Sequence, residues 1–114
     1  MRYTVLEKLL RRMGVGNQYV GFLYTIEAVK LYNEADDIVK TRLTKDIYPV
    51  IAKKFRTKHI GSVERNIRYV AELSWKKNRE LLEQVAGYPL KSRPKTSEFI
   101  DMLSYYLTEN SESK

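Results

Sequence analysis

Length, composition and charge set the first limits on this protein. The chain has 114 residues, of which 43% are hydrophobic; this suffices for one folded core and excludes a disordered basic tail. It has no cysteine, which excludes disulfides, thiolate metal sites and a cysteine nucleophile. No apolar run approaches the roughly 18 residues of a membrane span. Residues 1–12 lack the apolar core of a signal peptide, and we therefore expect a cytoplasmic protein.

The positive charge is concentrated in one central block. The net charge is +7, but residues 40–79 hold 12 Lys and Arg against three acidic residues and carry +9. The other 74 residues carry −2. A local basic block on an otherwise balanced domain is typical of a protein that binds a polyanion, most often nucleic acid. The alternative is a solvated surface that binds nothing acidic.

Apolar residues recur at helical spacing through the first half of the chain. No segment there alternates for long between apolar and polar residues as a half-buried strand does. Gly14 and Gly16 form a turn signal after the first helix, and Pro49 suits the first position of a new one. The spacing predicts helices over residues 5–13, from 22 to an end near 33–37, 38–47 and 49–55.

The second half continues the helical pattern. After a polar turn over residues 56–62, apolar residues from Val63 to Trp75 fall on one face of a helix. We then expect a short helix over 80–86, a loop with two prolines, and a last helix from Thr96. The sequence therefore predicts an all-α fold, a compact bundle of about six helices. We expect one domain over residues 1–109 and a disordered tail over residues 110–114.

The helices over 49–55 and 63–75 form a recognisable pair. A short helix, a turn and a longer amphipathic helix are the pattern of a helix-turn-helix, whose second helix enters the major groove of DNA. We predict a recognition helix over about 62–76. Its outer face is expected to carry Ser62, Arg65, Arg68, Tyr69 and Glu72. An ordinary helical hairpin with a solvated charged face is the alternative interpretation.

The residue types on this pair suit two kinds of DNA contact. Arginine can donate two hydrogen bonds to guanine, so Arg65 and Arg68 are candidate base readers; Glu64 could accept from cytosine. Ser62 and Tyr69 on the same face are the other candidate base contacts. Cations on the first helix and the turn are placed to contact phosphates. These candidate phosphate contacts are Lys53, Lys54, Arg56, Lys58 and the single histidine, His59.

The order and spacing of these residues resemble a known family. The runs that carry the resemblance are 48–55 (YPVIAKKF), 62–69 (SVERNIRY) and 71–75 (AELSW), with further agreement at 21–24, 87–88 and 97–102. They resemble the C-terminal effector domain of the sporulation initiation (stage 0) response regulator of endospore-forming Firmicutes, over about residues 5–107. The resemblance implies an all-helical domain around a helix-turn-helix that binds promoter boxes in double-stranded DNA, often as tandem copies, and regulates transcription.

The resemblance also assigns roles within the recognition helix. It implies that Glu64 and Arg65 reach bases and that Arg68 lies near DNA on the same face. Three positions depart from the family pattern: Ser62 stands where the family has an arginine, Gly61 where it has a capping serine, and Tyr69 where it has a histidine. We therefore expect retained DNA binding with an altered preferred site; the alternative is weak, mostly electrostatic binding.

Further partners follow from the resemblance alone. Residues 76–88 look like the family region that meets an RNA polymerase sigma subunit, with Glu80, Glu83 and Gln84 as exposed candidates. The chain starts at Met1 directly before the first effector helix, which favours a free-standing, divergent paralogue without a receiver domain over an excised fragment. The alternative function is a degenerate effector domain that acts as a protein-interaction module on RNA polymerase or another regulator. We expect no enzyme activity, cofactor, metal, membrane or small-molecule substrate.

Overall fold

The computed structural model describes residues 3–111 and is helical throughout, with no strand in that range. The predicted all-α class is confirmed. In chain order the elements are α1 (Thr4–Arg12), α2 (Val20–Glu34), α3 (Asp37–Lys40), the π-helix η1 (Leu43–Ile47), α4 (Tyr48–Lys54), α5 (Ile60–Lys77), α6 (Arg79–Ala86) and α7 (Thr96–Ser111).

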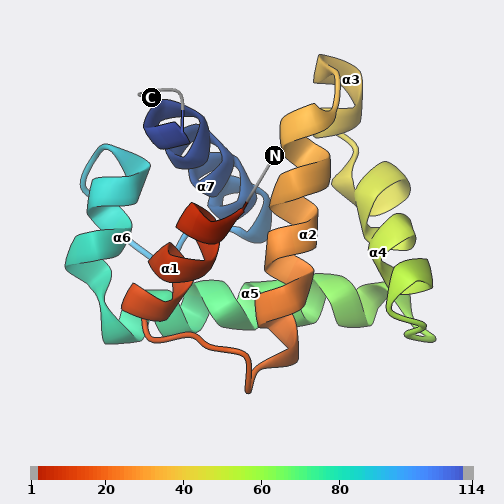
Figure 1. The fold of residues 1–114 in the computed structure, drawn as a ribbon, viewed down its shortest axis with the longest axis horizontal. Helices are drawn as coiled ribbons and strands as arrows, with labels where there is room; N and C mark the ends of the chain where they lie inside the picture. Colours follow the sequence, from red (N-terminus) through yellow and green to blue (C-terminus); the bar gives the residue numbers. More distant parts are fainter. Residues whose placement is uncertain (1–2, 112–114) are drawn as a thin grey trace.

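Helix α5 lies across the base of the molecule and α2 stands on it (Figure 1). Helix α4 lies beside one end of α5 and α6 beside the other, while α7 passes behind α1 and α2 (Figure 1). Apolar side chains from α1, α2, α4, α5, α6 and α7 meet in a single buried cluster that includes Leu10, Ala28, Ile51, Ile67 and Phe99. Helix α5, the longest of the described helices, has one face in the core and the other facing solvent.

The crossing of α2 over α5 depends on Gly21. A Cβ atom at this position would lie 2.3 Å from the backbone oxygen of Asn66 and 2.6 Å from Cγ2 of Val70. No side chain fits at these distances, so glycine allows the two helix backbones to approach closely. The close contact places the start of α2 directly beside the middle of α5.

Two helix boundaries in the structure differ from those expected from the sequence. The helix expected over 38–47 is broken after Lys40, and the chain resumes as η1, in which the Tyr48 N–H donates to the carbonyl of Leu43, five residues back. Pro49 has no N–H and follows at once in the first turn of α4, so the regular hydrogen-bond ladder cannot run through this point. The last helix extends through Asn110 to Ser111, past the expected end at 109; residues 112–114 of the expected tail lie outside the described residues.

The start of α5 also differs from the prediction. The helix begins at Ile60, two residues before the predicted recognition helix, so the connection from α4 is the five residues 55–59. His59 occupies the N-cap and makes no side-chain capping bond, which overturns the assignment of Gly61 to that position. A Cβ at Gly61 would meet nothing within 4 Å, because this first turn of α5 faces open solvent.

Candidate nucleic-acid interface

The exposed face of α5 is set by the face that it buries. Val63, Ile67, Val70, Ala71 and Ser74 are all buried in the core. On a helix of 3.6 residues per turn, the opposite side is then centred on positions 65, 69 and 76. Arg65, Tyr69 and Lys76 are indeed exposed. Arg65 makes no hydrogen bond or ion pair with any residue from 3 to 111, so its guanidinium is available to a partner.

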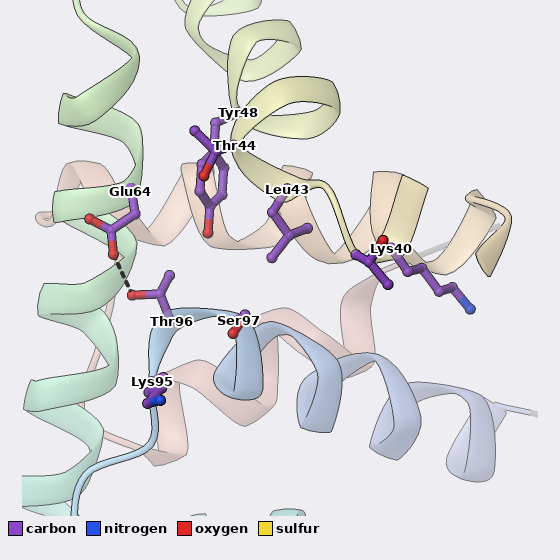
Figure 2. Close-up of a pocket in the computed structure, with 9 residues that line it drawn as sticks. Lys40, Leu43, Thr44, Tyr48, Glu64, Lys95, Thr96 and Ser97 are labelled. Carbon is purple, nitrogen blue, oxygen red and sulfur yellow. Dashed lines mark hydrogen bonds between the residues drawn. The ribbon is translucent and has the colours of Figure 1, made fainter. Parts of the chain in front are cut away.

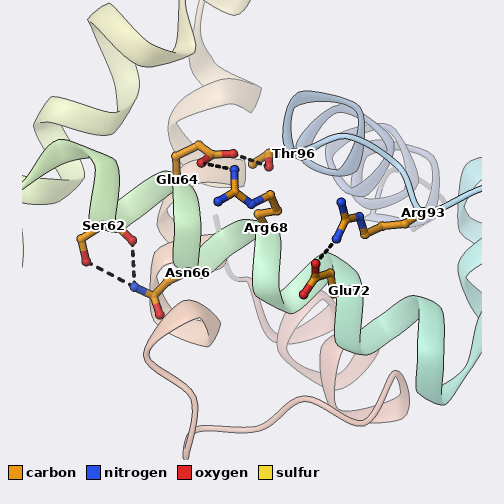
Figure 3. Close-up of polar contacts among 7 residues, drawn as sticks. All are labelled: Ser62, Glu64, Asn66, Arg68, Glu72, Arg93 and Thr96. Carbon is orange, nitrogen blue, oxygen red and sulfur yellow. Dashed lines mark hydrogen bonds and ion pairs between the residues drawn. The ribbon is translucent and has the colours of Figure 1, made fainter.

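Glu64 and Arg68 lie on a flank of α5 rather than on its outward face. Arg68 Nη1 donates to Glu64 Oε1 at 3.0 Å, and the hydroxyl of Thr96 donates to Glu64 Oε2 at 2.7 Å. Figure 3 shows both bonds on the side of α5 that faces the start of α7. Arg65 and Arg68 were expected to point the same way, but in the fold only Arg65 points outward. The side chain of Arg68 turns toward Glu64 (Figure 3).

The departure at Ser62 is accommodated within the helix. Asn66 Nδ2 donates to the Ser62 carbonyl at 2.8 Å and lies 3.3 Å from the Ser62 hydroxyl (Figure 3). Both residues are half-buried. Sequence reasoning missed Asn66, although its spacing of four from Ser62 allows this contact on any helix.

Tyr69 forms part of a small aromatic surface. Its ring is 46% exposed and packs edge-on against Tyr19, with ring centroids 6.0 Å apart. Lys77 Nζ lies 5.5 Å from the Tyr19 ring centroid on the same side. The start of α2 therefore supports the outward face of α5, which could not be read from the sequence because the two segments are about 50 residues apart.

The predicted phosphate contacts gather at the end of α4 and in the turn. Lys53, Lys54, Arg56, Lys58 and His59 are all exposed. Only Lys54 is engaged elsewhere: its Nζ lies 2.8 Å from Glu27 Oε1. The Lys54 side chain is 50% exposed but that of Glu27 only 13%, so Lys54 is less available to a phosphate than the other four residues.

Arg56 has an unusual backbone conformation. Its φ of 57° is left-handed, and it is the one residue other than glycine with a positive φ among residues 3–111. The Arg56 N–H donates to Lys53 O and the Thr57 N–H to Ala52 O, which is the Schellman pattern at the end of α4. The corresponding position after α1 is Gly14, and the left-handed residue at the end of α6 is Gly87, its C-cap. An arginine therefore stands at a position where glycine would be less strained.

A second contact ties α5 to the loop before α7. Arg93 forms an ion pair with Glu72, which the sequence had placed on the outer face (Figure 3). Arg93 was not predicted as a functional residue, since nothing in the sequence of a proline-containing loop indicates where it returns to a helix. Together with the bond from Thr96 to Glu64, this pair fixes one flank of α5 against that loop.

The three candidate contacts for a polymerase subunit differ in whether the fold already uses them. Glu83 on α6 accepts from Arg79 Nε at 3.4 Å and from the Leu90 N–H at 2.8 Å. Glu80 and Gln84 are exposed. Glu83 therefore serves the α6–α7 connection, and the other two side chains remain open to solvent.

No cluster of candidate metal ligands occurs in residues 3–111. In that range no group of three or more His, Asp and Glu side chains could hold a metal ion. No helix in the same range is long and apolar enough to cross a membrane.

The comparison with protein families decides the assignment. The model for the sporulation initiation factor Spo0A C-terminal domain matches residues 6–107. The chain belongs to the Spo0A C-terminal family. This family is one of DNA-binding regulatory domains and is not a family of enzymes. No solved structure gives a significant match to the chain.

Membership in the Spo0A C-terminal family agrees with the site geometry at a coarse level. The partner of the family is double-stranded DNA. In this member, the matched region includes the whole of α4, the turn and α5, where the exposed cations are concentrated.

Proposed function

We propose that this protein is a sequence-specific DNA-binding transcription regulator whose helix α5 enters the major groove. The observation that carries the proposal is Arg65: it lies at the centre of the outward face of α5, is exposed, and has no polar partner among residues 3–111. A free guanidinium on a helix of this kind can donate two hydrogen bonds to guanine. Tyr69 and Ser62 flank it on the same side.

The turn and the end of α4 supply the contacts that position the domain. Lys53, Lys54, Arg56, Lys58 and His59 are proposed to bind phosphates beside the groove. The left-handed conformation of Arg56 supports this role. Glycine would relieve the strain there, and the strained position instead carries an exposed cation that can pair with a phosphate.

Glu64 and Arg68 are proposed to act differently from each other. Both oxygens of Glu64 already accept hydrogen bonds, so Glu64 positions the flank of α5 and is not a primary base reader. Arg68 is held by an exposed i,i+4 pair worth about 0.3–0.5 kcal/mol. A good base contact discriminates by about 1–3 kcal/mol, so Arg68 can leave Glu64 when DNA is present.

The surface of α6 is the proposed site for a polymerase subunit, as the family resemblance implies. Glu80 and Gln84 are the side chains available for it, because Glu83 is used within the fold. Tandem binding of two copies on DNA is proposed on the same basis.

A selection from random duplex DNA at two salt concentrations tests the main proposal. We expect the recovered motif to lose its preference at one position in Arg65→Ala. A matched variant, Arg12→Ala, removes an exposed arginine from α1, outside the basic block, and is expected to leave the motif unchanged. Uniform binding that only falls with salt, and that Arg65→Ala does not alter in preference, would support electrostatic binding or the protein-interaction alternative instead.

A further inference from the structure

A polar cleft of about 470 Å³ lies beside the recognition helix, outside its outward face. Its walls come from the α3–η1 connection, the start of α4, one flank of α5 and the first residues of α7 (Figure 2). The residues that line it are Lys40, Thr41, Leu43, Thr44, Tyr48, Glu64, Lys95, Thr96 and Ser97. None of the proposed phosphate contacts to DNA belongs to it.

The hydroxyl of Tyr48 points into this cleft without a partner. The Tyr48 side chain is almost wholly buried, with 3% of the residue exposed, and its ring lies in the core between η1 and α5. Figure 2 shows the hydroxyl directed into the space between Glu64, Leu43 and Ser97. It makes no hydrogen bond with any described residue. Solvent in the cleft reaches the hydroxyl oxygen itself, and a ligand there would take the place of water as its acceptor.

The start of α7 also presents unpaired donors to the cleft. The first bond of this helix runs from the Phe99 N–H to the carbonyl of Lys95, so Lys95 occupies the N-cap. A lysine side chain cannot accept the free N–H groups of the first turn, and the Glu98 carboxylate accepts from the Lys95 N–H instead. The N–H groups of Thr96 and Ser97 therefore have no acceptor among residues 3–111. The positive end of the helix dipole lies at the same place.

The charge around the cleft favours an anion. Glu64 is the one carboxylate among its lining residues, and both its oxygens are already occupied by Arg68 and Thr96. A neighbouring hollow of about 220 Å³ shares Glu64, Lys95 and Thr96 with the cleft and adds Arg68 and Arg93, which are paired with Glu64 and Glu72. Lys40 contributes at the rim, although its ammonium group points away from the cleft in Figure 2.

The groups proposed to contact a ligand in the cleft can all donate hydrogen bonds. Burial, and to a smaller extent the charge of Glu64, raises the pKa of Tyr48 to about 12, so its hydroxyl keeps its proton at neutral pH. The N–H groups of α7 and the ammonium of Lys95 are also donors. The π-helix η1 forms the opposite wall, and such helices are frequent at functional sites.

We propose that this cleft binds a phosphate-type oxyanion. The Tyr48 hydroxyl, the Ser97 hydroxyl and the N–H groups of Thr96 and Ser97 donate to its oxygens, and Lys95 balances its charge. Two sources share this chemistry: a backbone phosphate of bound DNA and a free phosphorylated small molecule. The proposal does not rest on base reading by Arg65.

Titration of the isotope-labelled full chain with inorganic phosphate, followed by NMR at constant ionic strength, tests the site. We expect saturable shifts of the Thr96, Ser97 and Glu98 amides. Tyr48→Phe should weaken phosphate binding roughly tenfold, because it removes a hydrogen bond to a charged group. Ser97→Ala removes a hydroxyl from a largely exposed residue, cannot disturb the core, and should also weaken binding. Tyr24→Phe is the matched control, since Tyr24 is buried but does not line the cleft.

Addition of a short duplex to the phosphate-loaded protein separates the two sources. Release of phosphate, with the cleft amides still shifted, identifies a DNA phosphate as the occupant. Simultaneous binding of both identifies a free phosphorylated molecule. The site is overturned if the shifts do not saturate, if they spread over Lys53 and Lys58 equally, or if neither Tyr48→Phe nor Ser97→Ala weakens binding. A protein that binds phosphate but no duplex would refute the proposed function and leave the cleft intact.

Discussion

Thr96 donates a hydrogen bond of 2.7 Å to Glu64, although the two residues are 32 positions apart in the chain. Glu64 belongs to α5 and Thr96 is the first residue of α7. The carboxylate that looks most like a base reader in the sequence is therefore a structural link between two helices. The same carboxylate also holds Arg68 on the flank of α5.

Removal of this link should weaken the fold. Thr96→Val keeps the shape of the side chain but loses a hydrogen bond to a carboxylate, so we expect the free energy of unfolding to fall by roughly 1.5 kcal/mol. Urea denaturation measures the change. Thr44→Val is the control, because Thr44 is exposed and its hydroxyl makes no hydrogen bond among residues 3–111. Equal stability of the two variants would show that the bond contributes nothing.

Substitutions of Arg56 should affect the stability of the fold and its binding to DNA differently. Arg56→Gly relieves a left-handed backbone conformation, and we expect it to raise the free energy of unfolding by about 1 kcal/mol. Arg56→Ala keeps the strain and is expected to give no such gain. Both variants should bind duplex DNA more weakly, with the salt dependence of binding reduced by about one phosphate contact. Unchanged affinity and salt dependence in both would remove Arg56 from the interface.

The close approach of α2 to α5 should make Gly21 intolerant of change. Gly21→Ala places a Cβ 2.3 Å from a backbone oxygen, and we expect a loss of about 1–3 kcal/mol, or failure to fold. Gly61→Ala provides the control within α5. Its Cβ meets nothing within 4 Å, so the helix should gain about 0.5–1 kcal/mol from the better helix former. Thermal unfolding of the two variants compares them directly.

High pH should destabilise the protein through its buried tyrosines. Burial raises the pKa of Tyr48 to about 12; burial and the hydrogen bond to Asp101 do the same for Tyr32. The pKa of a tyrosine in an unfolded chain is about 10. The neutral form is thus favoured in the fold, and the stability that it contributes is present below about pH 10 and lost as the pH rises toward about 12.

Urea denaturation at about pH 9 and about pH 11 measures this loss. Tyr48→Phe cannot ionise at that position, so its free energy of unfolding should fall less between the two pH values than that of the parent chain. Tyr88→Phe is the control, because Tyr88 is 56% exposed and unfolding changes its surroundings little. An equal fall in both variants would show that Tyr48 already ionises in the fold as it does in the unfolded chain.

Several features of the fold follow from local signals. The helical periodicity places α1, α2, α5, α6 and α7 to within about three residues, because each has an apolar face of sufficient length. The α4–turn–α5 pair is visible for the same reason. The break between α3 and η1 and the early start of α5 were missed, since a π-helix before a proline and an N-cap histidine leave no regular pattern.

The sequence by itself determined the helical class, the position of the basic block and the residue types available for DNA, because these depend on spacing and on charge counted along the chain. Only the tertiary structure decided which of those residues face outward. Arg65 is free and Glu64 is not, because the loop that returns from α6 to α7 brings Thr96 against one flank of α5. The same return of the chain forms the cleft over Tyr48, from segments that are almost 60 residues apart.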